Sequence, residues 1–170
     1  MEIKYEVTKE DYIKFNLYHA QNSPYNKKIL ALSRYGIPVI FLPIIYFIGT
    51  KLFEQSDIYW VIIDILFSII WIVSYPQQHK LFLEKVTEKL INEGDNSELL
   101  GAKNMIIDDE TITIHNKSSF EKISKTAIKD VKIYDDLIVV YTSGITAHIV
   151  PTRSLDEKSK DNLIKKVINM

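Results

Sequence analysis

The sequence predicts an α+β membrane protein, in which a two-helix transmembrane hairpin carries a small antiparallel β-barrel or sheet with a C-terminal helix. Charge is the first reason, because residues 35–50 contain no Lys, Arg, Asp or Glu and residues 58–79 contain only Asp64. The second reason is the pattern after Ala102, where short alternating strands replace the long apolar runs. Segregation on this scale predicts two parts with different solvents, one lipid and one water.

Four segments follow from this division. Residues 1–33 form an N-terminal strand and helix that pack on the cytoplasmic module, and residues 34–76 form the two-span hairpin. Residues 77–101 are a charged helix and linker, and residues 102–170 are the β module with its C-terminal helix. The chain has no Cys and no Gly-rich, Pro-rich or Ser-rich linker.

Both apolar runs are long enough to cross a bilayer as helices. Residues 35–50, YGIPVIFLPIIYFIGT, would span about 24 Å and residues 58–75 about 27 Å, against a hydrocarbon core of about 30 Å. The stem of Lys51 extends the first span. The alternative is a soluble protein with two buried core helices, but a domain this small cannot surround two helices that are apolar on all sides. Aromatic residues lie mostly near the ends of the runs, as in a membrane belt: Tyr35, Tyr46, Tyr59, Trp60, Trp71 and Tyr75.

Basic residues predict the orientation of the hairpin. The loop between the spans, KLFEQSD, has Lys51 as its only base, together with Glu54 and Asp57. The positive-inside rule therefore predicts a multi-pass protein of the cell membrane with both termini in the cytoplasm. The bases outside the hairpin that carry this prediction are Lys27, Lys28, Arg34, His79, Lys80, Lys85 and Lys89.

Asp64 lies inside the second span, where a carboxylate costs about 2.5–3.5 kcal/mol. In an antiparallel hairpin the matching depth on the first span is near residues 44–47, so Tyr46 is the expected intramembrane polar contact. The carbonyl of Val39, which Pro43 leaves without a helical donor, is a second acceptor. Asp64 is either an ion site, proton site or contact with another membrane protein, or a polar clasp between helices or between copies of the chain.

The segments that flank the hairpin have recognisable signals. EIKYEV, residues 2–7, alternates like a half-buried strand and must join a sheet formed later in the chain. Thr8 and Asp11 resemble a capping box, and the helix that they open should stop before Pro24. After the second span, residues 77–93 read as a charged helix for which Gly94 is a suitable C-cap.

The C-terminal part reads as about six strands and one helix. MIID and TITIH form a hairpin with Ile112 and Ile114 inward, SFEKIS is a short strand, and IKDVKIY, LIVVY and ITAHIVP form a meander. Gly144 is expected in a left-handed turn position. Ser154 and Glu157 suggest a capping box for a helix that runs to about residue 169. We expect a small barrel closed by this helix, which is the order of the pleckstrin-homology-like fold.

Four stretches resemble the YcxB-like bacterial membrane family: KYEVTKEDYIKFNLYH, the two-span hairpin, the meander IKDVKIYDDLIVVYTSGITAHIVP, and VPTRSL before the last helix. The resemblance implies a pleckstrin-homology-like cytoplasmic module and no known chemistry. The family usually has a Trp before the meander, where this chain has Thr126 and Ala127.

No residue pattern indicates catalysis, a metal or a cofactor. The chain has 21 basic and 22 acidic residues, which does not favour a nucleic-acid partner. Its four histidines are far apart in sequence, although His115 and His148 could meet across a sheet, and nucleotide and hydrolase motifs are absent. We therefore expect that the protein is not an enzyme. Five lysines in one stretch are candidates for facing an anionic lipid surface: Lys117, Lys122, Lys125, Lys129 and Lys132.

The function expected from these features is a membrane-anchored, non-catalytic interaction module that recognises a protein or lipid at the cytoplasmic face. The alternative is an immunity protein that protects the membrane against a secreted or pore-forming toxin, with Asp64 and the hairpin in contact with it. The expected partners are membrane lipid and a protein of unknown identity, which in the alternative is a toxin. A homo-oligomer is a further expected partner, held by a polar clasp between copies of the chain. A transporter is a third and weaker alternative, because two spans enclose a pathway only in an oligomer.

Overall fold

The computed structural model describes residues 1–53, 55–96 and 98–168 of the 170-residue chain, with only the backbone of Ile168. The chain forms two compact units. Met1–Asn16 and Thr87–Met170 make one, called here the sheet unit, and Leu17–Val86 make the other, called the hairpin unit.

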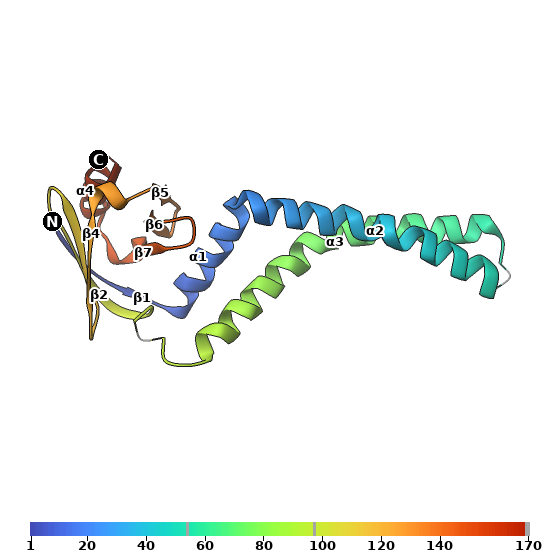
Figure 1. The fold of residues 1–170 in the computed structure, drawn as a ribbon, viewed down its shortest axis with the longest axis horizontal. Coiled ribbons are helices and arrows are strands. Elements are labelled where there is room, and N and C mark those ends of the chain that lie inside the picture. Colours follow the sequence, from blue (N-terminus) through green and yellow to red (C-terminus); the bar gives the residue numbers. More distant parts are fainter. Residues whose placement is uncertain (54, 97, 169–170) are drawn as a thin grey trace. The chain divides into compact units, whose positions relative to one another are not determined.

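The first sheet of the sheet unit is built on the N-terminal strand. β1 (Glu2–Val7) pairs antiparallel with β2 (Gly101–Ile107), so the prediction that this strand joins a later sheet is confirmed. The order continues through β3 (Thr111–His115) to β4 (Phe120–Ser124). Figure 1 labels β1, β2 and β4 of this sheet. Alternation fixes the inward face, because Ile3, Tyr5 and Val7 are buried while their neighbours are exposed. Ile112 and Ile114 point inward as predicted.

A second sheet and a helix complete the unit. β5 (Asp130–Ile133), β6 (Leu137–Tyr141) and β7 (Ala147–Pro151) form a three-stranded antiparallel sheet. All five residues of β6 are buried, as expected for its central position. α4 (Glu157–Ile168) adds Leu163 and Val167 to the core.

The predicted closed barrel is wrong, because the strands form two separate sheets. The short 3₁₀ helix η1 (Lys125–Ala127) interrupts the chain between β4 and β5, and these strands belong to different sheets. β1 and β7 are the other places where closure would require a ladder, and no strand pairing joins them in the described chain. Each sheet therefore keeps its own edges.

One shorter helix precedes the two long apolar helices. α1 (Lys9–Asn22) ends before Pro24, as predicted, and Ser23 caps the next helix by accepting from the backbone N–H of Asn26. α2 (Pro24–Leu52) continues through two internal prolines. α3 (Asp57–Asn92) is one helix through Pro76, so the predicted charged helix after the second span is present as the continuation of that span. Proline removes one backbone donor, but the helix resumes on the other side.

The turn and cap residues agree with the sequence prediction only in part. Gly94 has a φ of 119°, as the end of a helix favours, whereas Gly144 does not adopt a positive φ and the predicted left-handed turn there is wrong. The cap of α4 is Asp156, whose Oδ1 accepts from the N–H of Ser159 at 3.2 Å. Ser154 instead ends a 3₁₀ turn, η2 (Thr152–Ser154), and residue 169, the predicted end of the helix, lies outside the described residues.

Candidate functional site

The hairpin is apolar on its outside and closely packed on its inside. In α2 and α3, only 6% of the most apolar window of each helix is buried within the structure. Between them, Gly49 packs against the ring of Trp60, and Phe41 lies 6.2 Å from Phe67, centroid to centroid. Both helices are long and apolar enough to cross a membrane.

Asp64 lies between these two contacts, at the depth predicted from an antiparallel hairpin. Its side chain is 7% exposed, and its Oδ1 has no hydrogen-bond partner among the described residues. Tyr46 is half-buried, and its ring lies edge-on to Phe47 at 5.9 Å. No hydrogen bond joins Tyr46 to Asp64 in the described part of the chain. One turn before Asp64, the Nε1 of Trp60 is likewise buried and unpartnered.

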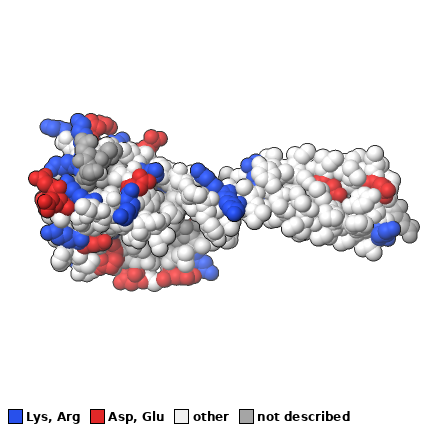
Figure 2. All heavy atoms as spheres, turned by 45° about the horizontal axis from the view of Figure 1, so that its top comes forward, with Lys and Arg blue, Asp and Glu red and all other residues white. Residues whose placement is uncertain are grey.

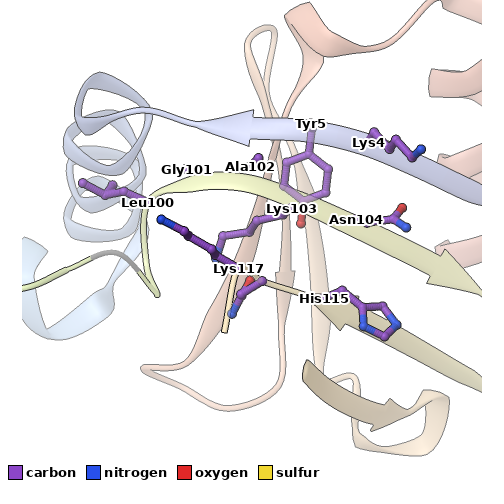
Figure 3. A pocket seen from close by; sticks show the side chains of 10 residues that line it. Lys4, Tyr5, Leu100, Gly101, Ala102, Lys103, Asn104, His115 and Lys117 are labelled. Atoms are coloured by element: carbon purple, nitrogen blue, oxygen red, sulfur yellow. The ribbon is translucent and has the colours of Figure 1, made fainter. Parts of the chain in front are cut away.

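The sheet unit contains a groove, called here the lysine groove. Its volume is about 540 Å³, and its side chains come from β1, β2 and the end of β3 (Figure 3). Lys4 pairs with Asn104 and Asn104 with His115, so the register of three strands sets one row of the groove. The described lining residues include no Asp or Glu: Lys4, Tyr5, Leu100, Gly101, Ala102, Lys103, Asn104, His115, Asn116 and Lys117.

The lysine groove combines positive charge with unused hydrogen-bonding atoms. The Oη of Tyr5 and the Oδ1 atoms of Asn104 and Asn116 are buried and have no partner among the described residues. Burial lowers the pKa of Lys103, although Glu98 and Glu121 raise it. Buried polar groups normally have a partner. The arrangement therefore suits a ligand that brings an anionic group together with hydrogen-bond donors.

A second cavity, of about 320 Å³, shares Tyr5, Lys103 and Asn116 with the lysine groove and extends to β7. His148 lines it, with Nε2 3.6 Å from Oε1 of Glu121. Burial lowers the pKa of His148, and Lys103 lowers it further, while Glu121 raises it. His115 is on β3 of the other sheet, where its ring centroid lies 5.9 Å from that of Phe120, so the two histidines do not share a sheet.

The C-terminal part of the sheet unit contains the second sheet and the helix that follows it. A comparison with known families finds its match in this part of the chain. Residues 107–167 match the YcxB-like protein family. The match covers β3 to α4, including the meander and the VPTRSL stretch, while β1 and the hairpin unit lie outside it. Comparison with curated proteins finds no match for this chain.

The YcxB-like region distributes the five predicted lysines over several elements. Lys117 lies in the lysine groove, and Lys122 is on β4 opposite Thr113. Lys125 begins η1, and Lys129 precedes β5. Lys132 is on β5 in the other sheet, where its Nζ lies 2.9 Å from Asp130, a hydrogen bond that raises the pKa of Lys132. The structure thus brings one of the five into the groove and disperses the rest.

The same region supplies an ion pair that sequence reasoning missed. Arg153 of η2 binds Asp11 through both guanidinium Nη atoms, with Nη2 2.6 Å from Oδ2. Asp11 is 2% exposed and also accepts from the N–H and hydroxyl of Thr8, which confirms the predicted capping box. Burial raises the pKa of Asp11, but the hydrogen bonds from Arg153 and Thr8 outweigh it and hold the pKa below its usual value.

The described residues contain no group of three His, Asp or Glu side chains placed to hold a metal ion. The two hollows described in the sheet unit present charged and hydrogen-bonding side chains.

Proposed function

We propose that this protein is a membrane-anchored, non-catalytic interaction module. The hairpin crosses the cell membrane twice, both termini lie in the cytoplasm, and the sheet unit recognises a protein or lipid at the cytoplasmic face. The proposal depends most on one observation, the exposure of large apolar side chains along α2 and α3, such as Leu32 at 67%, Ile62 at 52% and Val73 at 71%.

Soluble proteins rarely expose apolar side chains along two whole helices, because their largest contiguous apolar patch usually measures a few hundred Å². Figure 2 shows charged side chains gathered on the sheet unit, while the visible face of the hairpin is nearly free of them. Lipid tails would cover such a surface without cost. The bases that flank the spans, against a single Lys in the connecting loop, favour the cytoplasmic placement of both termini.

The order of elements in the sheet unit supports the proposal that this unit has a pleckstrin-homology-like fold. A four-stranded sheet, a three-stranded sheet and a closing helix follow one another in chain order. β1 precedes the hairpin in the chain and pairs with β2, which follows it. Residues 8–100 are therefore inserted between two paired strands of the first sheet. A recognition module joined to the membrane anchor through both β1 and β2 stays at the membrane surface, where its effective concentration toward surface partners is high.

The lysine groove is the surface that we assign to recognition. Lys4 and Lys117 are exposed on it, and the buried acceptors of Asn104 and Asn116 lie beside them. The anionic group of a ligand would pair with the lysines, and N–H or O–H donors elsewhere on the ligand would satisfy the amide oxygens. The immunity function gains less support, because Asp64 is too buried to contact a toxin that approaches from the lipid.

The anchor is tested by cysteine labelling, for which the chain is well suited because it has no native Cys. Cys is introduced at Gln55 in the connecting loop and, separately, at Ser143 in the β6–β7 turn, and intact cells are treated with a membrane-impermeant maleimide. We expect labelling of Gln55→Cys only. Labelling of both variants, or recovery of the protein in the soluble fraction after ultracentrifugation without detergent, would refute the anchor.

Recognition is tested by crosslinking in native membranes followed by mass spectrometry. Lys4→Gln/Lys117→Gln removes two charges from the lysine groove, and Lys158→Gln/Lys160→Gln on α4 removes two charges outside it. A protein or lipid partner of the groove should be lost with the first pair and retained with the second. Equal capture by both variants would assign recognition to another surface.

A further inference from the structure

A pocket of about 380 Å³ in the hairpin unit lies where three helices meet. The end of α1, the first turns of α2 and the middle of α3 contribute its walls. All of its lining residues belong to the hairpin unit: Leu17, Ala20, Gln21, Asn26, Lys27, Leu30, Pro76, Gln77, His79, Lys80 and Leu83. We call it the basal pocket.

The polar part of the basal pocket is suited to an anion. Lys27 and Lys80 provide two cations and His79 a third titratable donor, and no described lining residue is acidic. The nearest carboxylate to Lys80 is that of Glu84, at 3.8 Å, and both side chains are partly exposed, so this pairing is weak. Gln21, Asn26 and Gln77 add neutral amide donors.

The apolar part of the pocket indicates that the anion carries hydrocarbon. Leu17, Leu30 and Leu83 line the same hollow as the lysines. Beyond the pocket the helices lose their charge, since residues 35–50 and 65–79 contain no Lys, Arg, Asp or Glu. The exposed apolar side chains of Leu32, just before the first stretch, and Val73, within the second, belong to this apolar surface. The basal pocket is therefore at the level where charged surface gives way to the proposed spans.

Aromatic side chains mark the same boundary. Trp71, Tyr75 and His79 stack successively along α3, with ring centroids 5.2 Å and 6.0 Å apart. Trp and Tyr concentrate at the headgroup level of membranes. This row ends at His79, which lines the basal pocket.

We propose that the basal pocket binds one anionic phospholipid of the cytoplasmic leaflet, with its phosphate held by Lys27, Lys80 and His79 and its acyl chains leaving along the exposed apolar faces of α2 and α3. Basic hollows between membrane helices on the cytoplasmic side are suited to such headgroups. A soluble phosphate would use the lysines but not the leucine walls, which is why the pocket favours a lipid. The inference rests on the proposed membrane anchor and goes beyond it in assigning a bound lipid.

The test uses the full chain in nanodiscs of phosphatidylcholine, with or without a fraction of phosphatidylglycerol, and in detergent with each lipid added. Thermal unfolding gives the stabilisation by each lipid, and native mass spectrometry gives the lipid retained through purification. We expect phosphatidylglycerol to raise Tm more than phosphatidylcholine. Lys27→Gln/Lys80→Gln should weaken this effect, by about thirtyfold in half-saturating lipid for two lysine contacts.

The matched control is Lys28→Gln/Lys85→Gln, which removes the same charge from exposed neighbours on the same two helices that do not line the pocket. It should respond to phosphatidylglycerol as the wild type does. Lys27→Arg/Lys80→Arg keeps the charge and should retain binding, which separates loss of the site from loss of folding. Equal weakening in the two Gln pairs would show general attraction to an anionic surface and overturn the proposal.

Two further outcomes also overturn it. Stabilisation by glycerol 3-phosphate equal to that by phosphatidylglycerol would identify a soluble ligand, and equal stabilisation by both phospholipids would deny any role to the headgroup charge. In either case the protein would still be embedded in the nanodisc, so the membrane anchor would stand. A chain that does not enter nanodiscs at all would refute the anchor itself.

Discussion

The Nε of Arg34 donates a hydrogen bond of 2.8 Å to the carbonyl oxygen of Ile72. This carbonyl is the one that Pro76, four residues later in α3, leaves without a helical donor. Arg34 thus repairs the backbone of the neighbouring helix at the point where proline interrupts it. Trp71 makes a reciprocal contact, since its Nε1 lies 3.3 Å from the carbonyl of Ser33. Together the two bonds tie α2 to α3 at the base of the apolar spans.

Arg34→Met should therefore lower the stability of the hairpin, and the loss should depend on Pro76. With Pro76 present, the free carbonyl loses its charged donor, at a cost of about 1.5–3 kcal/mol. In a Pro76→Ala background the new N–H can bond to Ile72, so Arg34→Met should cost much less. Thermal unfolding in detergent of the four proteins measures this coupling. An equal loss in both backgrounds would mean that Arg34 acts through something other than this carbonyl.

Gly49 is required by the packing of Trp60. A Cβ at residue 49 would lie 2.1 Å from the indole ring, which forces the helices apart. Gly49→Ala should destabilise the hairpin by about 1–3 kcal/mol, as overpacked sites do. Gly36→Ala on the same helix is the control, because a Cβ there meets Leu32 at an ordinary 3.6 Å. Similar melting temperatures for the two variants would contradict the close contact.

Substitutions of Asp64 distinguish a polar clasp between helices from a buried carboxylate that lacks a partner. The sequence suggested a clasp, for which Asp64→Asn should be tolerated and Asp64→Leu should weaken the protein. In the structure the buried Oδ1 has no partner among the described residues, so Asp64→Leu should be neutral or stabilising because it removes an unsatisfied polar atom. Melting of wild type, Asn and Leu variants in detergent decides between them. A clear loss in the Leu variant would restore the clasp, within the hairpin or between copies.

Asp11 and Arg153 should make the sheet unit sensitive to acid. The pKa of Asp11 in the folded chain is below its ordinary value of 3.8, because the bonds from Arg153 and Thr8 outweigh burial. The stabilisation is therefore complete above pH 3.8 and is lost as the pH falls through the lower, folded value. Arg153→Met should cost about 2–3 kcal/mol at neutral pH and progressively less in acid. A loss that did not change between neutral and low pH would assign the effect to packing.

The buried ring of His148 should make stability depend on pH in a higher range than Asp11 does. Its folded pKa is below the ordinary 6.5, so the unfolded chain binds a proton more readily than the folded one. This contribution to stability is fully present above pH 6.5 and declines as the pH falls toward the folded value. His148→Gln, which cannot be protonated, should flatten the pH dependence of denaturant unfolding in that range. An unchanged pH dependence in the His148→Gln variant would contradict this role of the buried ring.

The sequence alone determined the features that depend on local pattern and solvent. Alternation in EIKYEV and TITIH fixed which side chains of β1 and β3 are buried, and the spacing of Thr8 and Asp11 fixed the cap of α1. The absence of charge from two long stretches was sufficient to predict two apolar helices. These properties arise within a few residues, or from composition, so neighbouring letters contain them.

Only the tertiary structure decided which distant groups meet. Arg153 reaches Asp11 across 142 residues, and the lysine groove joins Lys4 to Asn104 across the inserted hairpin. The separation into two sheets, in place of a barrel, depends on which strand edges pair, and the repeating pattern within a strand does not specify its neighbour. The continuity of α3 through Pro76 has the same origin, because the donor that satisfies Ile72 comes from another helix. Side-chain period and solvent preference are local, whereas hydrogen-bond partners and hollows are created by the path of the whole chain.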